Sequence, residues 1–353
     1  MKDRQLQKSL PSADSAPPIS LEPPKNSNFR FLAVFLICCA ILIAAFAASA
    51  MLVKGSAHGG FLPFWKENSS QESPEGESST EDSLNEESPK EPTKIPQGAL
   101  VIVSKDLSCP ELGESYIHNE TPYRPNLTEL LEKELLPIAS DGMPRVLVLH
   151  THTSEGYLED GTKFLDGAPG DLTYSKDETQ NVLAVGQAFV EALNEKGITA
   201  IHCTVMHDTP SLGGSYERSA ETVRRYLEQY PTITYVIDLH RDAMITADGE
   251  YIRTKSADPS VAQVMAVVGS DCNGTRHELW EENLALALQL RRALNQKLPD
   301  ACRPVSLRKA SYNQELAPRF LLLEIGSGAN TVKEAQNAAR LVGETLADLL
   351  YAR

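Results

Sequence analysis

The chain has 353 residues and a formal net charge of −15, and 41% of its residues are hydrophobic. This length is enough for one large domain or two ordinary ones. The acidity argues against a nucleic-acid-binding protein, which would need basic patches to contact phosphates. The six cysteines include no C-x-x-C pair, which argues against a zinc site built from thiolates.

The first element along the chain is an uncharged, apolar run over residues 31–53. Because about 20 such residues span a bilayer, we predict a single transmembrane helix there. Residues 1–30 carry an excess of Lys and Arg, so we expect them to form a cytoplasmic tail, with the rest of the chain on the extracytoplasmic side of the cell membrane. The alternative is a cleaved signal peptide, because Ala48-Ser-Ala50 resembles a cleavage site; the long apolar run and long leader favour a retained anchor.

Residues 54–97 follow as a predicted linker. Their central part, from Lys66 to Lys94, is dense in Glu, Ser and Pro and almost free of apolar side chains. A segment of this composition cannot bury enough surface to fold and repels itself by charge. We therefore predict an acidic, disordered spacer between the membrane and the folded part of the chain.

Residues 98–353 alternate strand-like apolar runs with amphipathic helical segments. This pattern predicts an α/β domain with a mostly parallel or mixed central sheet and helices on both faces. The predicted strands cover residues 145–149, 199–205, 232–239, 261–268 and 319–325. The predicted helices cover residues 127–136, 181–196, 216–229, 280–298 and 331–351.

Polar side chains follow the first of these strands at once, in the sequence His150-Thr-His152-Thr-Ser-Glu155. Buried strands of α/β sheets present functional groups at their carboxyl ends. His152 and Glu155 have a spacing at which an imidazole and a carboxylate can reach one metal ion. His150 is an alternative first histidine, and Glu178, ahead of the helix predicted from residue 181, is an alternative carboxylate.

Two other strands end in the same way. One leads into Asp238-Leu-His240-Arg241-Asp242, and another ends at Glu324. Two histidines and a carboxylate are a common ligand set for catalytic Zn²⁺, which leaves a fourth position open. Asp238 is placed to orient a neighbouring histidine from behind. We therefore predict a zinc site that includes His240.

Glu324 is the predicted general base of this site. A carboxylate at the end of an apolar strand is costly unless it has a function, and burial raises its pKa toward the range useful for proton transfer. Arg241 is a candidate for steadying an oxyanion. The polar loop from Gly156 to Gln180 is a candidate substrate-contacting loop, and Tyr312-Asn-Gln314 is polar enough to bind a peptide or a sugar.

Several of these motifs, taken in order, resemble the stage II sporulation protein P (SpoIIP) family. The resemblance covers nearly the whole predicted domain. The motifs that carry it are His150-Thr-His-Thr-Ser-Glu-Gly-Tyr157, Asn181-Val-x-x-Val-Gly186, Tyr216-Glu-Arg-Ser219, Asp238-Leu-His-Arg-Asp-Ala243, Tyr312-Asn-Gln314 and Leu323-Glu-Ile-Gly326.

That family is similar to zinc-dependent N-acetylmuramoyl-L-alanine amidases, so the resemblance implies a membrane-anchored enzyme that cuts stem peptides from glycan strands. It also implies endopeptidase action on cross-links, a role in engulfment during endospore formation, and the stage II sporulation proteins D and M (SpoIID and SpoIIM) as partners. The match implies that His240 is the second zinc histidine and Glu324 the catalytic glutamate. It leaves the first histidine at His150 or His152 and favours a glutamate near Glu178.

Two other functions compete with this interpretation. A zinc carboxypeptidase would use a similar H-x-x-E pair with a later histidine and a glutamate at a strand end. A scaffold with a decayed site would bind the cell wall and hold no zinc.

Overall fold

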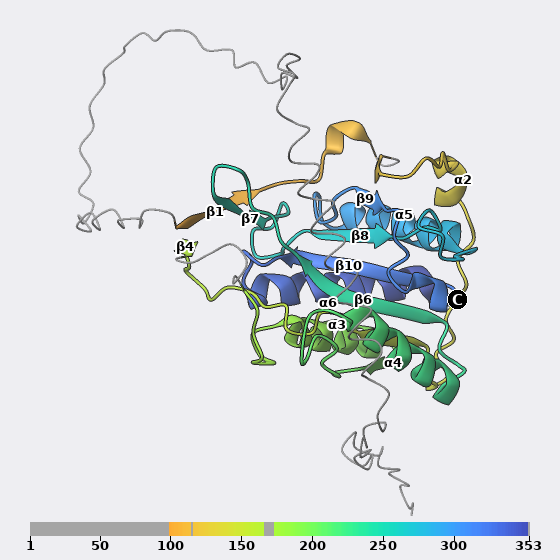
Figure 1. Ribbon diagram of the computed structural model, residues 1–353. Coiled ribbons are helices and arrows are strands. Elements are labelled where there is room, and N and C mark those ends of the chain that lie inside the picture. Colours follow the sequence, from red (N-terminus) through yellow and green to blue (C-terminus); the bar gives the residue numbers. More distant parts are fainter. Residues whose placement is uncertain (1–98, 114–115, 166–172, 352–353) are drawn as a thin grey trace, which may run out of the picture. The chain divides into compact units, whose positions relative to one another are not determined.

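The computed structural model describes residues 99–113, 116–165 and 173–351, which form a mixed α/β unit around a seven-stranded sheet (Figure 1). The strand order is β2-β9-β8-β10-β6-β3-β5. β8 runs antiparallel to β10, and the other neighbouring pairs are parallel. The strands are β2 (Ile117–Asn119), β3 (Val146–Leu149), β5 (Ala200–His202), β6 (Tyr235–Asp242), β8 (Val264–Val268), β9 (Val305–Leu307) and β10 (Phe320–Ser327).

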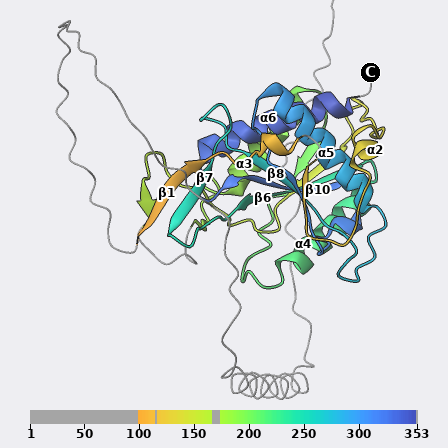
Figure 2. The ribbon, with the colours of Figure 1, turned by 90° about the horizontal axis from the view of Figure 1, so that it is seen from above.

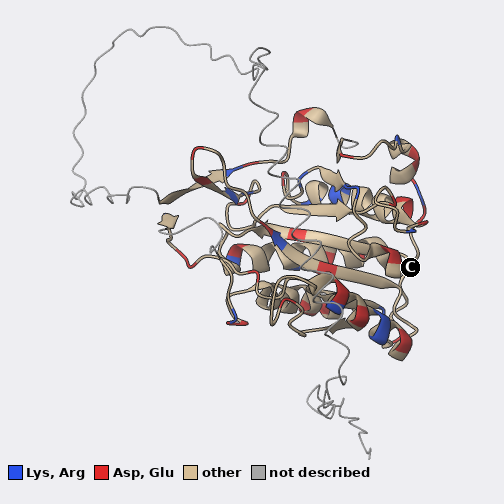
Figure 3. Cartoon of the chain, viewed as in Figure 1, with Lys and Arg blue, Asp and Glu red and all other residues tan. Residues whose placement is uncertain are grey.

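The inner strands are apolar runs because both of their sides are covered by protein. All four residues of β3 are buried, as are the first four of β10. The prediction of a mixed sheet with helices on both faces is confirmed. Charged residues nevertheless interrupt the two central strands, β6 and β10, in Figure 3.

The helices cover the two faces unequally (Figure 2). Side chains of α3, α5 and α6 share one core cluster with Leu321, Leu323 and Ile325 of β10. On the other face, α4 contributes Val223 to a smaller cluster with Phe320. The longer helices are α3 (Val182–Glu195), α4 (Ser215–Gln229), α5 (Trp280–Lys297) and α6 (Val332–Leu350), and the short ones are α2 (Leu127–Leu131), η2 (Pro110–Leu112) and η3 (Gln314–Leu316).

A second, three-stranded sheet has the order β4-β1-β7. Its strands are β1 (Leu100–Lys105), β4 (Phe164–Leu165) and β7 (Glu250–Thr254). β1 pairs with β7 in parallel and with β4 antiparallel. None of these strands is predicted from the sequence. β4 has only two residues, and β7 (Glu250-Tyr-Ile-Arg-Thr254) shows no period of two.

The predicted boundaries differ from the structure at several places. β6 continues three residues beyond the predicted end, so His240 lies within the strand and not after it. The predicted strand over residues 199–205 stops at His202, and the predicted helix over residues 127–136 stops at Leu131. That helix ends in a tightened last turn, in which the Glu132 N–H donates to Glu129 O at 3.2 Å.

The tail, transmembrane helix and acidic linker predicted over residues 1–97 lie outside the described residues. Within the described ranges, none of the helices combines the length and apolar character needed to cross a bilayer.

Candidate active site

His240 and Glu324 lie side by side at the centre of the sheet. They are register partners in the parallel β6–β10 pair. Because side chains alternate along a strand, both point to the face that Phe320 shares with α4. His240 is almost completely buried, whereas Glu324 is only partly so.

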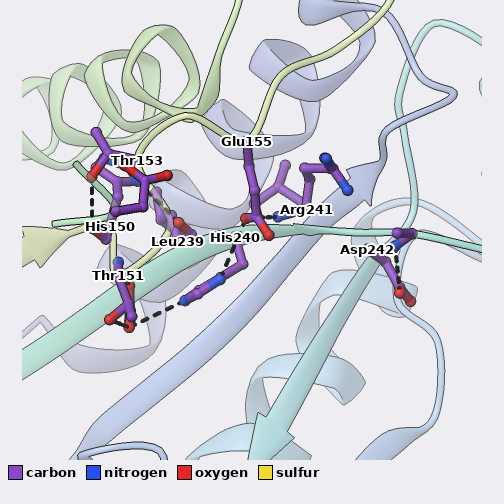
Figure 4. Close-up of polar contacts among 12 residues, drawn as sticks. His150, Thr151, Thr153, Glu155, Leu239, His240, Arg241 and Asp242 are labelled. Atoms are coloured by element: carbon purple, nitrogen blue, oxygen red, sulfur yellow. Dashed lines mark hydrogen bonds and ion pairs between the residues drawn. The ribbon is translucent and has the colours of Figure 1, made fainter. Parts of the chain in front are cut away.

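A turn directly after β3 brings His152 and Glu155 to His240. The Glu155 backbone N–H donates to His152 O at 3.1 Å and closes the turn. Glu155 Oε2 then lies 3.4 Å from His240 Nδ1, and the His152 ring lies edge-on to the His240 ring, with 5.3 Å between centroids. Figure 4 shows Glu155 and His240 pointing toward each other from the turn and from β6.

Asp238 supports His240 from the other side of the ring. Its Oδ2 lies 3.2 Å from His240 Nε2, at ion-pair distance but without hydrogen-bond alignment. Asp238 also accepts hydrogen bonds from the Thr151 backbone N–H at 2.8 Å and from its hydroxyl at 2.6 Å. Burial alone would lower the pKa of His240, but the carboxylates of Asp238 and Glu155 outweigh it and hold that pKa well above its ordinary value.

Burial raises the pKa of Glu324 to about 8, against the opposing influence of His240. Nearby Asp242 and Glu155 contribute to this raised pKa. A carboxyl group with a pKa near neutrality can both accept and release a proton under physiological conditions. The arrangement therefore places a proton-transfer group beside the imidazole of His240.

Three buried polar atoms of this group make no aligned hydrogen bond among the described residues: His152 Nδ1, Glu324 Oε2 and His240 Nε2, the last of which faces Asp238 Oδ2 at 3.2 Å. The imidazoles of His152 and His240 and the carboxylate of Glu155 are the donor types that suit Zn²⁺, so the chemistry of these residues fits the ion. Across the described ranges, however, no three His, Cys, Asp or Glu side chains already have the spacing of a metal site. Glu155 and His240 face each other as an ion pair instead.

His150 and Glu178, the alternative metal ligands left open by the sequence, lie in different surroundings. His150 is fully buried, with Nδ1 2.9 Å from Leu239 O and Nε2 2.9 Å from His202 Nε2, so both of its ring nitrogens are engaged. Glu178 is exposed. The structure thus brings His152 and Glu155 to His240, and it uses His150 in a core pair.

Arg241 alternates with His240 on β6 and points the other way. Its guanidinium donates from Nε to Gly156 O at 3.2 Å and from Nη2 to Thr173 O at 3.0 Å. Its backbone N–H donates to Glu155 Oε2 at 3.1 Å. These contacts fix Glu155 and the loop that follows it, and the oxyanion role of Arg241 stays a prediction.

Two supporting contacts of the site have no signal in the sequence. Asp208 accepts hydrogen bonds from the Ser154 backbone N–H at 2.8 Å and from its hydroxyl at 2.5 Å, which holds the turn that carries His152. Arg303, almost fully buried, pairs with Asp242 at 2.9 Å. The Ser154–Asp208 and Asp242–Arg303 pairs each join segments that are distant in the sequence, so no local spacing predicts them.

Comparison with known proteins finds a family model and a curated relative that match this chain. The family model of stage II sporulation protein P matches residues 61–347. The stage II sporulation protein P of Bacillus subtilis (strain 168) is 29% identical over 218 residues, covering 58% of this chain and 51% of that protein. The chain therefore spans about half the length of this curated relative.

Solved structures of N-acetylmuramoyl-L-alanine amidases are also similar. The Clostridium difficile 630 enzyme has 13% identity and a TM-score of 0.36, over 59% of this chain and 95% of that one. Apo Ami1 from Mycobacterium abscessus has 15% identity and a TM-score of 0.35, over 59% of this chain and 99% of that one. Both TM-scores lie below 0.5, so the family assignment rests on the sequence match.

Proposed function

The chain belongs to the stage II sporulation protein P family, and from this premise we propose that it is a zinc-dependent N-acetylmuramoyl-L-alanine amidase that cuts stem peptides from peptidoglycan. The observation that supports the proposal is the meeting of His152 and Glu155 with His240, the register partner of Glu324. In this assignment the first three residues hold the metal and Glu324 moves the proton. His150 and Glu178 remain outside the ligand set.

Binding of the ion would use His240 and His152 together with Glu155, whose carboxylate is already held by the backbone N–H of Arg241. When bound, zinc supplies Lewis acidity, which polarises a carbonyl group and makes water more acidic. Asp238 keeps the His240 ring in place, as carboxylates behind metal-binding histidines commonly do.

Glu324 carries the proton transfer. Its unpaired Oε2 accepts a proton from the attacking water and delivers it to the amine nitrogen of L-alanine as the amide bond breaks. A base positioned in this way contributes roughly 10²- to 10⁴-fold to a rate. Register pairing with His240 keeps the carboxylate at a fixed distance from the ligand cluster.

Several parts of the proposal rest on the family resemblance and on the sequence of residues 31–53. These are endopeptidase action on cross-links, work in engulfment with SpoIID and SpoIIM, and a single-pass anchor that keeps the catalytic unit outside the cytoplasm. Reconstitution of the full chain in vesicles, followed by protease protection, tests the orientation of the anchor.

One observation favours a different function, a cell-wall-binding scaffold without zinc: the described side chains do not form a ready-made metal cluster. Metal analysis of the purified full chain separates the two functions. A zinc carboxypeptidase, the other rival, would release C-terminal residues from free-acid peptides and leave amidated peptides intact.

Digestion of purified sacculi by the full chain tests the amidase directly. We expect mass spectrometry to find free stem peptides that begin with L-alanine. Glu324→Gln should lower their release at least about 100-fold, whereas Glu228→Gln, an exposed carboxylate on α4, should change nothing. Full release by a zinc-loaded Glu324→Gln protein would overturn the assignment of the base.

A further inference from the structure

Two tyrosines lie beside the candidate active site. The Tyr216 ring lies edge-on to the His152 ring, with 5.5 Å between centroids, and the Tyr312 ring lies 6.0 Å from that of Tyr216. Both rings are only half-buried, so each keeps a surface that a ligand can reach. The proposed mechanism uses neither of them.

The segment that presents Tyr312 is held in a strained conformation. Tyr312 and Asn313 have φ angles of 54° and 60°, in the left-handed region that is costly for residues other than glycine. Gln314 anchors the segment to the end of β8. Its buried side chain accepts a hydrogen bond from the Gly269 N–H at 2.9 Å and donates one to Val267 O at 2.8 Å. Strain of this kind persists where the surrounding contacts fix one geometry.

A buried chain of hydrogen bonds joins this segment to the proposed metal ligands. Asn313 Nδ2 donates to Ser219 Oγ at 3.0 Å and to Tyr216 O at 2.8 Å. The Ser219 and Thr151 hydroxyls lie 2.8 Å apart, and Thr151 in turn donates to Asp238 beside His240. The position of the Tyr312 ring is thereby tied to the position of His240.

Charge is distributed unequally about His240. Further along β6, Asp242 pairs with Arg303, and the Nε and Nη2 of this arginine have no partner among the described residues. On the tyrosine side, Arg308 and Glu120 act on Tyr312 and form an ion pair with each other. The carboxylate of Glu324 acts on both tyrosines, and those of Asp238 and Glu155 act on Tyr216. These carboxylates would repel the carboxylates of a stem peptide from the tyrosine side, whereas an uncharged sugar ring is not repelled.

We propose that Tyr312, backed by Tyr216, forms a sugar-binding subsite that holds a pyranose ring of the glycan strand beside the amide to be cut. The inference rests on the proposed function for the identity of the polymer. The tyrosine faces supply a flat apolar surface for the C–H face of the sugar, and the phenolic hydroxyls remain available for its polar groups.

Binding of a neutral, peptide-free sugar tests the subsite without any hydrolysis. We would titrate the full chain with a tetramer of N-acetylglucosamine by calorimetry, and separately with a free stem tetrapeptide. Tyr312→Asn removes the ring while Asn tolerates the left-handed conformation. Tyr312→Phe keeps the ring, and Tyr116→Ala removes an exposed tyrosine elsewhere in the sequence.

We expect Tyr312→Asn to weaken the binding of the tetrasaccharide about tenfold, the loss of one good aromatic contact. Binding of the tetrapeptide should not change, and Tyr312→Phe and Tyr116→Ala should bind the sugar nearly as the wild type does. Failure of the wild type to bind the sugar, equal binding by Tyr312→Asn, or an equal loss for sugar and peptide would each overturn the subsite. A protein that binds the sugar but cuts no amide would refute the proposed function alone.

Discussion

His150 and His202 form a buried pair immediately behind the site. Burial, and then the proximity of His202, lowers the pKa of His150 to about 3, and burial lowers the pKa of His202 to about 4. Gly186 on α3 leaves the space for both rings, since a Cβ there would lie 2.6 Å from the Nε2 atom of each. Both imidazoles therefore stay neutral in the folded protein well below the pH at which free histidine takes up a proton.

This pair should make stability depend on pH. Above about pH 6.5 both folded and unfolded chains carry neutral imidazoles. As the pH falls below that value, the unfolded chain binds protons that the folded chain does not, so stability is lost until the pH reaches the folded pKa values. For His150 the loss is about 1.4 kcal/mol per pH unit, and His202 adds to it.

The measurement is urea unfolding of the Glu324→Gln protein between pH 7 and pH 4.5. Glu324 has to be removed because its raised pKa stabilises the folded state as the pH falls and so opposes the histidines. A further His202→Gln substitution should flatten the dependence. An unchanged slope in that double variant would show that the pair does not control acid stability.

The identity of some site residues was within reach of the sequence, while the contacts that support them were not. His240 and Glu324 follow apolar runs, and the fold places the ends of such runs together. The choice of Glu155 over Glu178 depends on the course of the turn after β3, which residue spacing does not determine. The hydrogen bonds from Asn313 to Asp238 join the residue before η3, helix α4, the turn after β3 and strand β6, so no local pattern could predict them.

At the scale of elements, α3 and α6 make the most extensive helix–helix contact among the described residues. Gly343 on α6 permits it, because a Cβ there would lie 2.9 Å from Phe189 O and 2.9 Å from Ala192 Cβ on α3. Alanine favours a helix over glycine by about 1 kcal/mol. Here the methyl group would meet a backbone carbonyl, which cannot move without shifting α3.

Gly343→Ala should therefore destabilise the protein, by about 1–3 kcal/mol as overpacked cores do, in spite of its better helix propensity. Thermal unfolding followed by circular dichroism measures the change. Lys333→Ala, an exposed site in the first turn of α6, should stay within about 0.5 kcal/mol of the wild type. A stabilised Gly343→Ala protein would mean that the two helices separate easily.

Some helices and strands can be predicted from a single sequence, and others cannot. The predicted strands are runs of buried apolar residues, and the longest helices have clear ends, such as the capping box of Thr331 and Glu334 on α6. β2 and β9 have only three residues each and show no period. β7 forms because β1 pairs with it from a distant part of the chain, which is tertiary information.

For the whole molecule, the proposed zinc site predicts a link between metal and stability. An ion that binds only the folded chain at a thousandfold excess over its Kd stabilises it by about 4 kcal/mol. Zinc should therefore raise the unfolding temperature of the full chain, and a chelator should reverse the rise. This readout does not require activity.

His240→Ala should abolish the shift in unfolding temperature. His118→Ala, which removes an exposed imidazole, serves as the control for nonspecific zinc binding and should keep it. Equal shifts in the two variants would place the ion somewhere other than at His240.

The small sheet also has a mechanical consequence. β1 is the first strand of the described chain, and five consecutive residues of it pair in parallel with β7, which Figure 1 shows beside it. A pull on the chain ahead of Leu100 would stretch this ladder along its length, so that its cross-strand bonds resist together in shear. Tension that passes the ladder would reach β6, which precedes β7 in the chain, and also the end of β10, because Ser327 donates to Ile252 O and the Thr254 N–H donates to Asn330 Oδ1. The two strands that carry His240 and Glu324 would therefore be loaded together by a force on the leading segment.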